Sequence, residues 1–140
     1  MKVLLDLNVV LDVVLNRQPW IAESAAVWNA HHSGAYDGFL AATELTNLFY
    51  IVRRLAGEST ARSAVRSCLA TFDMVPVDRS VLFRADQQTG IDFEDNVAIA
   101  CEVAAGIDLI VTRDPAGFAH SPVPAVSPAD LLARIAPTNP

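Results

Sequence analysis

The chain lacks long apolar runs and cysteine clusters, two features that mark common protein classes, and it contains a single lysine. Every apolar run in its 140 residues is interrupted before the roughly 18–20 residues that a membrane span requires. The 2 cysteines, Cys68 and Cys101, lie far apart and outside any CxxC or Cys/His cluster. We therefore expect buried free thiols, and neither a disulfide, a zinc site nor a membrane segment.

Length and composition predict one domain over residues 1–140, since domains commonly contain roughly 100–200 residues. The hydrophobic content of 52% and the mean hydropathy of +0.32 exclude a disordered chain. Asp6, Asn8 and Asp12 break up the first apolar segment, which disfavours a signal peptide and predicts a cytoplasmic location. We interpret the proline-rich tail from about residue 121 as the end of the same domain.

The charge balance is acidic, with a net charge of −6 from 16 acidic and 10 basic residues. Such an excess normally argues against a nucleic-acid partner, because affinity for phosphates comes largely from Lys and Arg. That argument fails where divalent cations bind several carboxylates, since the cations reverse the local charge. The positions of the acids therefore decide between the two cases.

Short apolar runs alternate with amphipathic helical patterns along the chain. The runs predict strands over residues 2–6, 36–41, 74–77, 107–111 and 123–126. The periodic segments predict helices over residues 9–15, 21–33, 43–55, 59–70, 80–88, 93–105 and 128–135. We expect Leu55 and Phe93 to belong to buried stripes of their helices. The alternation predicts a three-layer α/β/α domain around a mostly parallel sheet of four to five strands.

Acids from distant segments fall at one edge of this predicted sheet. Asp6 ends the first strand, Glu44 lies in the first turn of the helix after the second, and Asp114 follows the fourth. In open parallel sheets, ligands bind outside the carboxyl ends of the strands. Asp95, in the first turn of the helix that begins at residue 93, is compatible with the same edge.

Each acid also has a structural explanation. Asp6 can cap the following helix, Asp95 can complement a helix dipole, and Asp114 precedes a proline as in many turns. Glu44 is harder to explain in this way, because it shares a helical face with Leu48 and borders the apolar stripe. An acid in that position without a nearby basic partner suggests a metal or a functional pocket.

Four carboxylates at one edge would repel each other and resist ionisation unless cations bound there. Ligand sets made only of oxygen suit Mg²⁺ or Mn²⁺ better than zinc. Bound to such a cluster, these ions can activate water and stabilise the charge that develops on a phosphate. The acids therefore lead to the hypothesis of metal-assisted phosphodiester hydrolysis.

Four segments of the chain carry a family resemblance: LDLNVVLD at residues 5–12, ATEL at 42–45, DFEDNVAIA at 92–100 and VTRDPAGF at 111–118. In this order they resemble PIN-domain nucleases, and most closely the VapC-like toxins of bacterial toxin–antitoxin operons. The resemblance extends over essentially the whole chain. It implies a Mg²⁺- or Mn²⁺-dependent endoribonuclease that acts on RNA, is usually a homodimer and is inhibited by a cognate antitoxin.

The same resemblance implies roles for individual residues. The metal-binding and catalytic acids of the family correspond to Asp6, Glu44, Asp95 and Asp114. Asn8 and Thr112 match polar positions that orient ligands or water, although many relatives have Thr or Ser at the position of Asn8. Asp92 is either an outer acid of the site or, as we prefer, the N-cap of its helix.

Other charged residues have weaker signals. Arg113, Arg17 and Arg53 are candidate phosphate contacts, with ordinary surface or ion-pair roles as the alternative. Arg113 is the best of the three because it adjoins the predicted site. Asp12, six residues after Asp6, could reach the same edge, although we favour a position on the helix surface. On the solvent side we place Glu94 and the histidines His31, His32 and His120.

Other folds for phosphoryl chemistry also place an acid after the first strand. A haloacid-dehalogenase-type phosphatase needs a second Asp where Asn8 stands, and a response-regulator receiver needs a late lysine, whereas Lys2 is the only one. A Rossmann nucleotide-binding fold needs a Gly-rich loop that this chain lacks. Two alternatives to a toxin ribonuclease stay open: a catalytically inert PIN-like scaffold that binds RNA or a protein, and a non-toxin nuclease that processes RNA or DNA.

Overall fold

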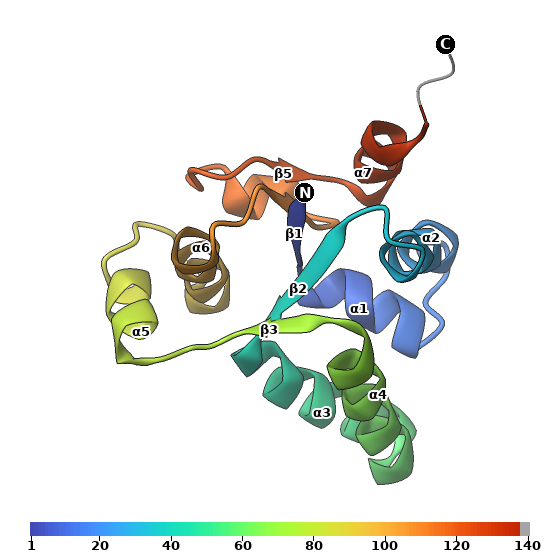
Figure 1. Cartoon of the computed structure of the whole chain (residues 1–140). Helices are drawn as coiled ribbons and strands as arrows, with labels where there is room; N and C mark the ends of the chain where they lie inside the picture. Colours follow the sequence, from blue (N-terminus) through green and yellow to red (C-terminus); the bar gives the residue numbers. More distant parts are fainter. Residues whose placement is uncertain (138–140) are drawn as a thin grey trace.

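Five short strands form one fully parallel sheet in the order β3-β2-β1-β4-β5 (Figure 1). The computed structural model describes residues 1–137. The strands are β1 (Lys2–Leu5), β2 (Asp37–Ala41), β3 (Asp73–Val75), β4 (Leu109–Val111) and β5 (Ala125–Val126). The sheet confirms the predicted parallel architecture, since all four pairs of neighbouring strands are parallel.

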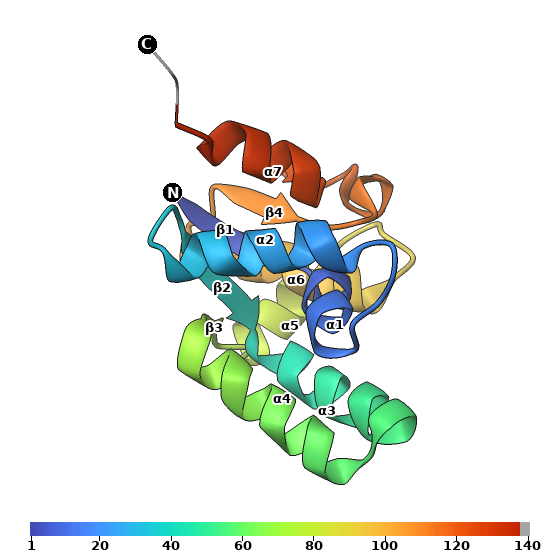
Figure 2. The same ribbon diagram turned by 90° about the vertical axis from the view of Figure 1, so that its right-hand side faces the viewer.

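Helices cover both faces of the sheet and complete three layers (Figures 1 and 2). One face carries α5 (Arg79–Asp86), α6 (Phe93–Ala105) and the short 3₁₀ helix η1 (Pro115–Phe118). The apolar cluster on the other face is built with α1 (Leu7–Val14), α2 (Ile21–His32), α3 (Ala42–Ala56), α4 (Glu58–Thr71) and α7 (Pro128–Ile135). None of the helices in residues 1–137 is both long and apolar enough to traverse a bilayer.

The central strand β1 shows how the sequence divides the core into two clusters. Successive side chains of a strand point to opposite faces of its sheet. Val3 and Leu5 accordingly enter the cluster beneath α1 and α2, whereas Leu4 enters the cluster beneath α6. All three are at most 2% exposed. A strand buried on both faces needs a continuous apolar run, which is what residues 3–5 provide.

The sheet topology brings the ends of three chain segments to one edge. The backbone N–H of Asp6, directly after β1, donates to the carbonyl of Val111 at the end of β4 (3.0 Å). Because α3 begins immediately after β2, Glu44 is the third residue of that helix. The carboxyl ends of β1, β2 and β4 therefore supply neighbouring positions for Asp6, Glu44 and Asp114. Together with Asp95, which lies near them in the first turn of α6, these residues are here called the acid rim.

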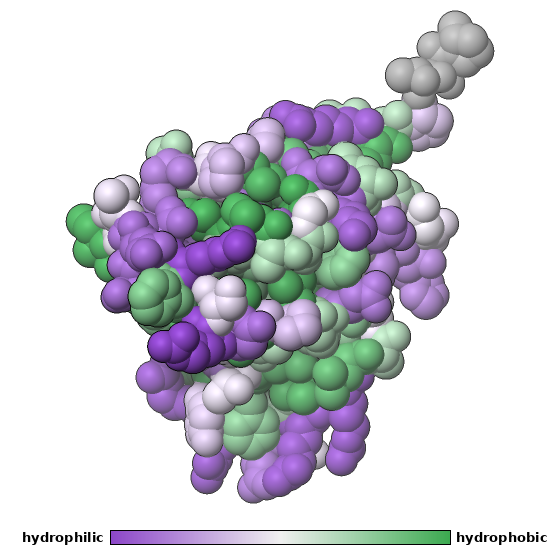
Figure 3. All heavy atoms as spheres, turned by 60° about the vertical axis from the view of Figure 1, so that its left-hand side comes forward, coloured by the Kyte–Doolittle hydropathy of each residue, from purple (hydrophilic) through white to green (hydrophobic). Residues whose placement is uncertain are grey.

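Three predicted side-chain environments differ from the structure. Phe93 and Leu55 were expected in buried stripes but are 51% and 59% exposed, because each lies in a terminal turn of its helix. Figure 3 shows that hydrophobic and hydrophilic side chains are mixed on the face that carries α5 and α6. His31, expected at the surface, is half-buried. Its Nε2 lies 2.7 Å from the carbonyl of Thr71 and its ring stacks on Phe72.

Candidate active site

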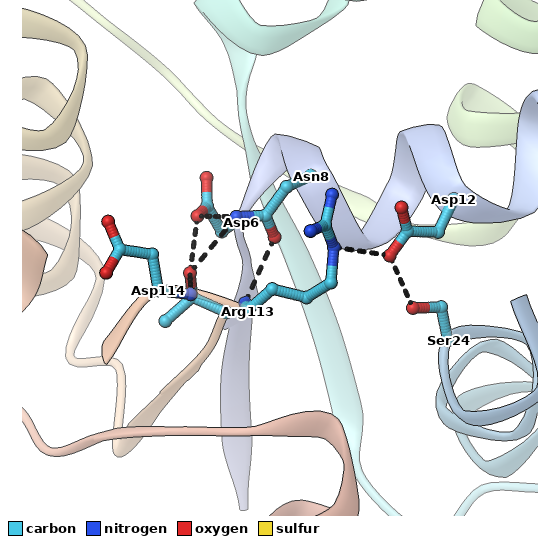
Figure 4. A network of polar contacts seen from close by, with 7 residues as sticks. Asp6, Asn8, Asp12, Ser24, Arg113 and Asp114 are labelled. Atoms are coloured by element: carbon cyan, nitrogen blue, oxygen red, sulfur yellow. Dashed lines mark hydrogen bonds and ion pairs between the residues drawn. The ribbon is translucent and has the colours of Figure 1, made fainter. Parts of the chain in front are cut away.

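Asp6 is held by two polar side chains at the end of the sheet. Its Oδ2 accepts hydrogen bonds from Thr112 Oγ1 (2.6 Å) and from Asn8 Nδ2 (2.9 Å). Thr112 is fully buried and directly follows β4, while Asn8 lies in the first turn of α1. Figure 4 shows Asp6 and Asn8 pointing toward the segment that carries Arg113 and Asp114. The two hydrogen bonds fix the orientation of the Asp6 carboxylate.

The same side chains fix the start of the loop that bears Asp114. Thr112 Oγ1 accepts a hydrogen bond from the backbone N–H of Asp114 (3.0 Å), and Asn8 Oδ1 accepts one from the backbone N–H of Arg113 (3.2 Å). Asn8 and Thr112 thus join the end of β4 to the start of α1. Their expected influence on ligands or water stays a prediction, whereas their bonds to Asp6 and to the backbone of Arg113 and Asp114 are present in the structure.

Glu44 is the most deeply buried acid of the rim. Its side chain is 5% exposed, and its Oε2 is buried without a hydrogen-bond partner in residues 1–137. Burial raises the pKa of Glu44 well above its usual range, and repulsion from Glu94, Asp6 and Asp95 raises it further. A buried carboxylate oxygen without a partner is costly, so this atom identifies Glu44 as a candidate ligand.

Asp95 and Asp114 approach each other across a glycine. A Cβ atom added to Gly117 would lie 3.0 Å from Asp95 Oδ2 and 3.3 Å from Asp114 Oδ2. Asp92 Oδ1 accepts hydrogen bonds from the backbone N–H groups of Glu94 and Asp95. This confirms the preferred reading of Asp92 as the N-cap of α6 and sets the position of Asp95 in the first turn.

The acids of the rim repel each other. Partial burial, followed by repulsion from Asp92, Asp6, Glu94 and Asp114, raises the pKa of Asp95 to about 6. The pKa of Asp6 is raised mainly by burial, against the hydrogen bond from Thr112, which lowers it. Repulsion between these carboxylates disfavours their ionised forms unless positive charge is bound to the cluster.

The donor set fits Mg²⁺ or Mn²⁺. All four side chains offer carboxylate oxygens, the ligand type that these ions prefer. The unpartnered oxygen of Glu44 is available as a ligand, and the carboxylates of Asp95 and Asp114 both lie close to Gly117. In residues 1–137, however, no three His, Cys, Asp or Glu side chains are already gathered closely enough to hold a metal. Binding would therefore require the carboxylates to draw together.

The arginines lie in different surroundings from those expected of a shared phosphate site. Arg113 and Asp114 are neighbours, yet their side chains point in opposite directions (Figure 4). The Arg113 guanidinium forms an ion pair with Asp12, and only 23% of its side chain is exposed. Arg17 follows the far end of α1, and Arg53 lies nine residues beyond Glu44, about 13 Å along α3. Phosphate contacts by these residues stay predictions.

Asp12 differs from its favoured placement on the helix surface, whereas Glu94 lies on the solvent side as expected. Asp12 is fully buried and paired with Arg113, so it is an internal residue of α1. Glu94 is exposed, but its carboxylate lies close enough to Glu44 to raise the pKa of that residue. The position of Glu94 in the first turn of α6 was the sequence signal that could have predicted this closeness to Glu44, because the N-terminus of α6 lies at the acid rim.

The chain is similar in sequence profile and in fold to known proteins. A sequence profile described as a PIN domain matches residues 2–116. The DNA-bound VapBC of Salmonella typhimurium has a similar structure, with a TM-score of 0.71 and 14% identity over 91% of this chain and 98% of that chain. A toxin–antitoxin complex from Klebsiella pneumoniae gives a TM-score of 0.66 and 19% identity over 90% and 97% of the two chains.

A third similar structure is VapC20 of Mycobacterium tuberculosis, described as a toxin that cleaves the sarcin-ricin loop. Its TM-score is 0.63, with 13% identity over 77% of this chain and 86% of that chain. No curated protein sequence matches the chain. The structural neighbours are too distant in sequence to show more than a common fold, but the profile match spans most of the chain. The chain belongs to the PIN-domain family.

Proposed function

We propose that this chain is a Mg²⁺- or Mn²⁺-dependent endoribonuclease and the toxin of a VapBC-type toxin–antitoxin pair. The observation that carries the proposal is the buried, unpartnered carboxylate oxygen of Glu44, close to Asp6 and Asp95 of the rim. Membership of the PIN-domain family supports nuclease activity. The similar fold of VapC20, a toxin that cleaves the sarcin-ricin loop, supports RNA as the substrate.

The residues of the rim would bind the ion, and neighbouring residues would orient these ligands. Asp6, Glu44, Asp95 and Asp114 would bind it. When bound, a divalent ion supplies positive charge for the phosphate and activates water. Thr112 and Asn8 fix the carboxylate of Asp6 through their hydrogen bonds, and Asp92 fixes the helical turn that carries Asp95. Hydrolysis adds the water oxygen to phosphorus, breaks one bond from phosphorus to a ribose oxygen, and leaves a proton on that oxygen.

A groove among the helices of this chain is a candidate binding site for the proposed antitoxin. This groove of about 450 Å³ lies between α1, α2 and α4. Val13, Val14, Trp28 and Ala64 give it an apolar part, and hydroxyl groups of α4 complete the lining: Ser59, Thr60, Ser63 and Ser67. The similar fold of a toxin–antitoxin complex from Klebsiella pneumoniae supports such a partner. An apolar segment of the antitoxin would bind in this groove, and a basic side chain of the same partner would enter the acid rim. We propose a cytoplasmic homodimer as the toxin form.

The proposal is tested by RNA cleavage with Mg²⁺, with Mn²⁺ and with EDTA. Asp6→Asn should abolish metal-dependent cleavage, since it removes a ligand while keeping the size of the side chain. Asp37→Asn is the matched control, because Asp37 is an exposed acid at the amino end of β2, on the opposite edge of the sheet. Circular dichroism of both variants verifies that they fold.

The outcomes separate the proposed function from its alternatives. Cleavage by wild type and Asp37→Asn, with none by Asp6→Asn, would support the ribonuclease. Equal cleavage by all three proteins would contradict the assigned site. Absence of cleavage across a broad RNA panel, with retained RNA or protein binding, would favour the inert scaffold.

A further inference from the structure

A cavity of about 300 Å³ adjoins the acid rim between the start of α6 and η1. This volume is at the lower end of the roughly 300–1,000 Å³ that ligand pockets commonly have. The residues that line it include Gly90, Ile91, Asp92, Asp95, Gly117 and His120. Because Asp95 belongs both to this cavity and to the acid rim, a group bound here would lie beside the proposed metal site.

Two glycines let the walls of this cavity approach one another closely. A Cβ atom on Gly90 would lie 2.7 Å from Cε1 and Nε2 of His120, so the imidazole lies directly against the Gly90 backbone. A Cβ atom on Gly117 would press on Asp95 and Asp114. The Gly90 loop is itself held, since its carbonyl accepts a hydrogen bond from Asn96 Nδ2 (3.0 Å). The cavity is thus a defined shape next to the rim.

The lining combines a stacking surface with hydrogen-bond acceptors. Ile91 is fully exposed, and with the imidazole of His120 it offers an apolar and an aromatic surface. Unpaired RNA bases commonly stack on such side chains. Asp92 and Asp95 add carboxylates, which accept hydrogen bonds from the amino groups of bases. Their negative charge disfavours a phosphate, so the cavity suits the base and the metal site suits the phosphate.

We propose that this cavity binds an unpaired RNA base carrying an exocyclic amino group, adjacent to the phosphate that is cut. The assignment rests on the proposed ribonuclease function and names part of its substrate specificity. Adenine, cytosine and guanine carry such an amino group, whereas uracil does not. His120 would be a specificity residue that stacks on the base, and Asp92, which caps α6 through Oδ1, would select bases with amino groups through Oδ2.

The binding test uses nucleosides, which have no phosphate to cut. Adenosine, cytidine and uridine are titrated into ¹⁵N-labelled protein in EDTA. Adenosine and cytidine should shift the amide signals of Gly90 and Gly117, with uridine binding about tenfold more weakly. His120→Ala should lose these shifts, His120→Phe should retain stacking, and the exposed His32→Ala should behave as wild type. Absence of shifts, equal binding of uridine, or unchanged binding by His120→Ala would overturn the proposal.

The cleavage test maps the cut sites in a randomised RNA pool with Mn²⁺. Wild type and His32→Ala should avoid uracil at one position flanking the cut, and His120→Ala should lose this bias and cut about tenfold more slowly. Unchanged bias and rate in His120→Ala would overturn the base pocket while leaving the ribonuclease intact. Nucleoside binding at Gly90 and Gly117 without RNA cleavage would support the base pocket and contradict the ribonuclease.

Discussion

Arg113 and Asp12 form an ion pair inside the protein, with 2.8 Å between Arg113 Nε and Asp12 Oδ2. Asp12 is fully buried, and its Oδ2 also accepts a hydrogen bond from Ser24 Oγ (3.0 Å). The Arg113 guanidinium carbon lies 4.0 Å from the ring centroid of Trp20. The pair joins the loop after β4 to α1 and α2. Arg113, which adjoins Asp114 of the acid rim, therefore holds these two helices against that loop.

Breaking this pair from either side should destabilise the protein. Asp12→Asn or Arg113→Met should lower the free energy of unfolding by about 3 kcal/mol, because each leaves the other charge largely buried without its partner. The joint Asp12→Asn and Arg113→Met variant should cost less than the sum of the two single variants, since no unpaired charge remains. Urea denaturation measures all three values.

The exposed pair of Arg62 and Glu58 provides the control. These side chains are 59% and 58% exposed, so Arg62→Met should cost less than about 1 kcal/mol. If Arg113→Met were as mild as Arg62→Met, the ion pair would contribute no more than a surface contact.

Replacing a rim acid should improve the stability of the metal-free protein. Glu44→Gln removes a repelled carboxyl group, so in EDTA its melting temperature should equal or exceed that of wild type. Saturating Mn²⁺ should raise the melting temperature of wild type by several degrees, since a ligand that binds only the folded state stabilises it. Glu44→Gln should lose most of this gain. An equal gain in both proteins would remove Glu44 from the metal site.

Gly117→Ala should weaken metal binding more than it weakens folding. The added Cβ would press on the carboxylates of Asp95 and Asp114, which must move by a few tenths of an ångström. We expect about a tenfold loss of Mn²⁺ affinity by calorimetry, as for other residues that position metal ligands. The urea midpoint of the metal-free protein should change little. Unchanged affinity would show that the carboxylates do not depend on this space.

A buried acid outside the rim predicts how stability depends on pH. Burial raises the pKa of Glu102 to about 8, against the hydrogen bond from Ser121, which lowers it. In the unfolded chain this group has its ordinary pKa of 4.5. Between these values the folded state holds a proton that the unfolded state has lost, so stability falls as pH rises from 4.5 toward about 8.

The variant Glu102→Gln isolates this contribution, because an amide does not titrate and can still accept the hydrogen bond from Ser121. The difference in unfolding free energy between variant and wild type should increase in favour of the variant by at most about 1.4 kcal/mol per pH unit. It should level off above the pKa of the folded state. Parallel profiles for the two proteins would contradict the raised pKa.

Local sequence signals predicted most of the fold. The apolar run at Val3–Leu5 predicted β1 because a strand buried on both faces requires one, and Asp92 predicted the start of α6 because its side chain caps that helix. Exposed ends were harder to predict. Phe93 continues the helical apolar pattern but lies in the first turn of α6, and periodicity alone does not show where the neighbouring layer ends.

The site could be predicted only in part for the same reason. Strand ends and first helical turns identified Asp6, Glu44, Asp95 and Asp114 as neighbours, because parallel topology brings such positions to one edge. The ion pair of Arg113 depends on the packing of α1 and α2 against the loop after β4, which no local pattern records. The closeness of Glu94 to Glu44 likewise depends on tertiary packing, because α3 and α6 begin about fifty residues apart in the sequence.

The central claim is that the acid rim binds a divalent metal ion, and anomalous X-ray diffraction from crystals containing Mn²⁺ tests it most directly. The account predicts one or more anomalous peaks at coordination distance from Asp6, Glu44, Asp95 and Asp114, with no peak there in crystals of Asp6→Asn. A rim without anomalous density in the wild type, at Mn²⁺ concentrations that support activity, would contradict the account. A Mn²⁺ peak bound away from these four acids would do the same.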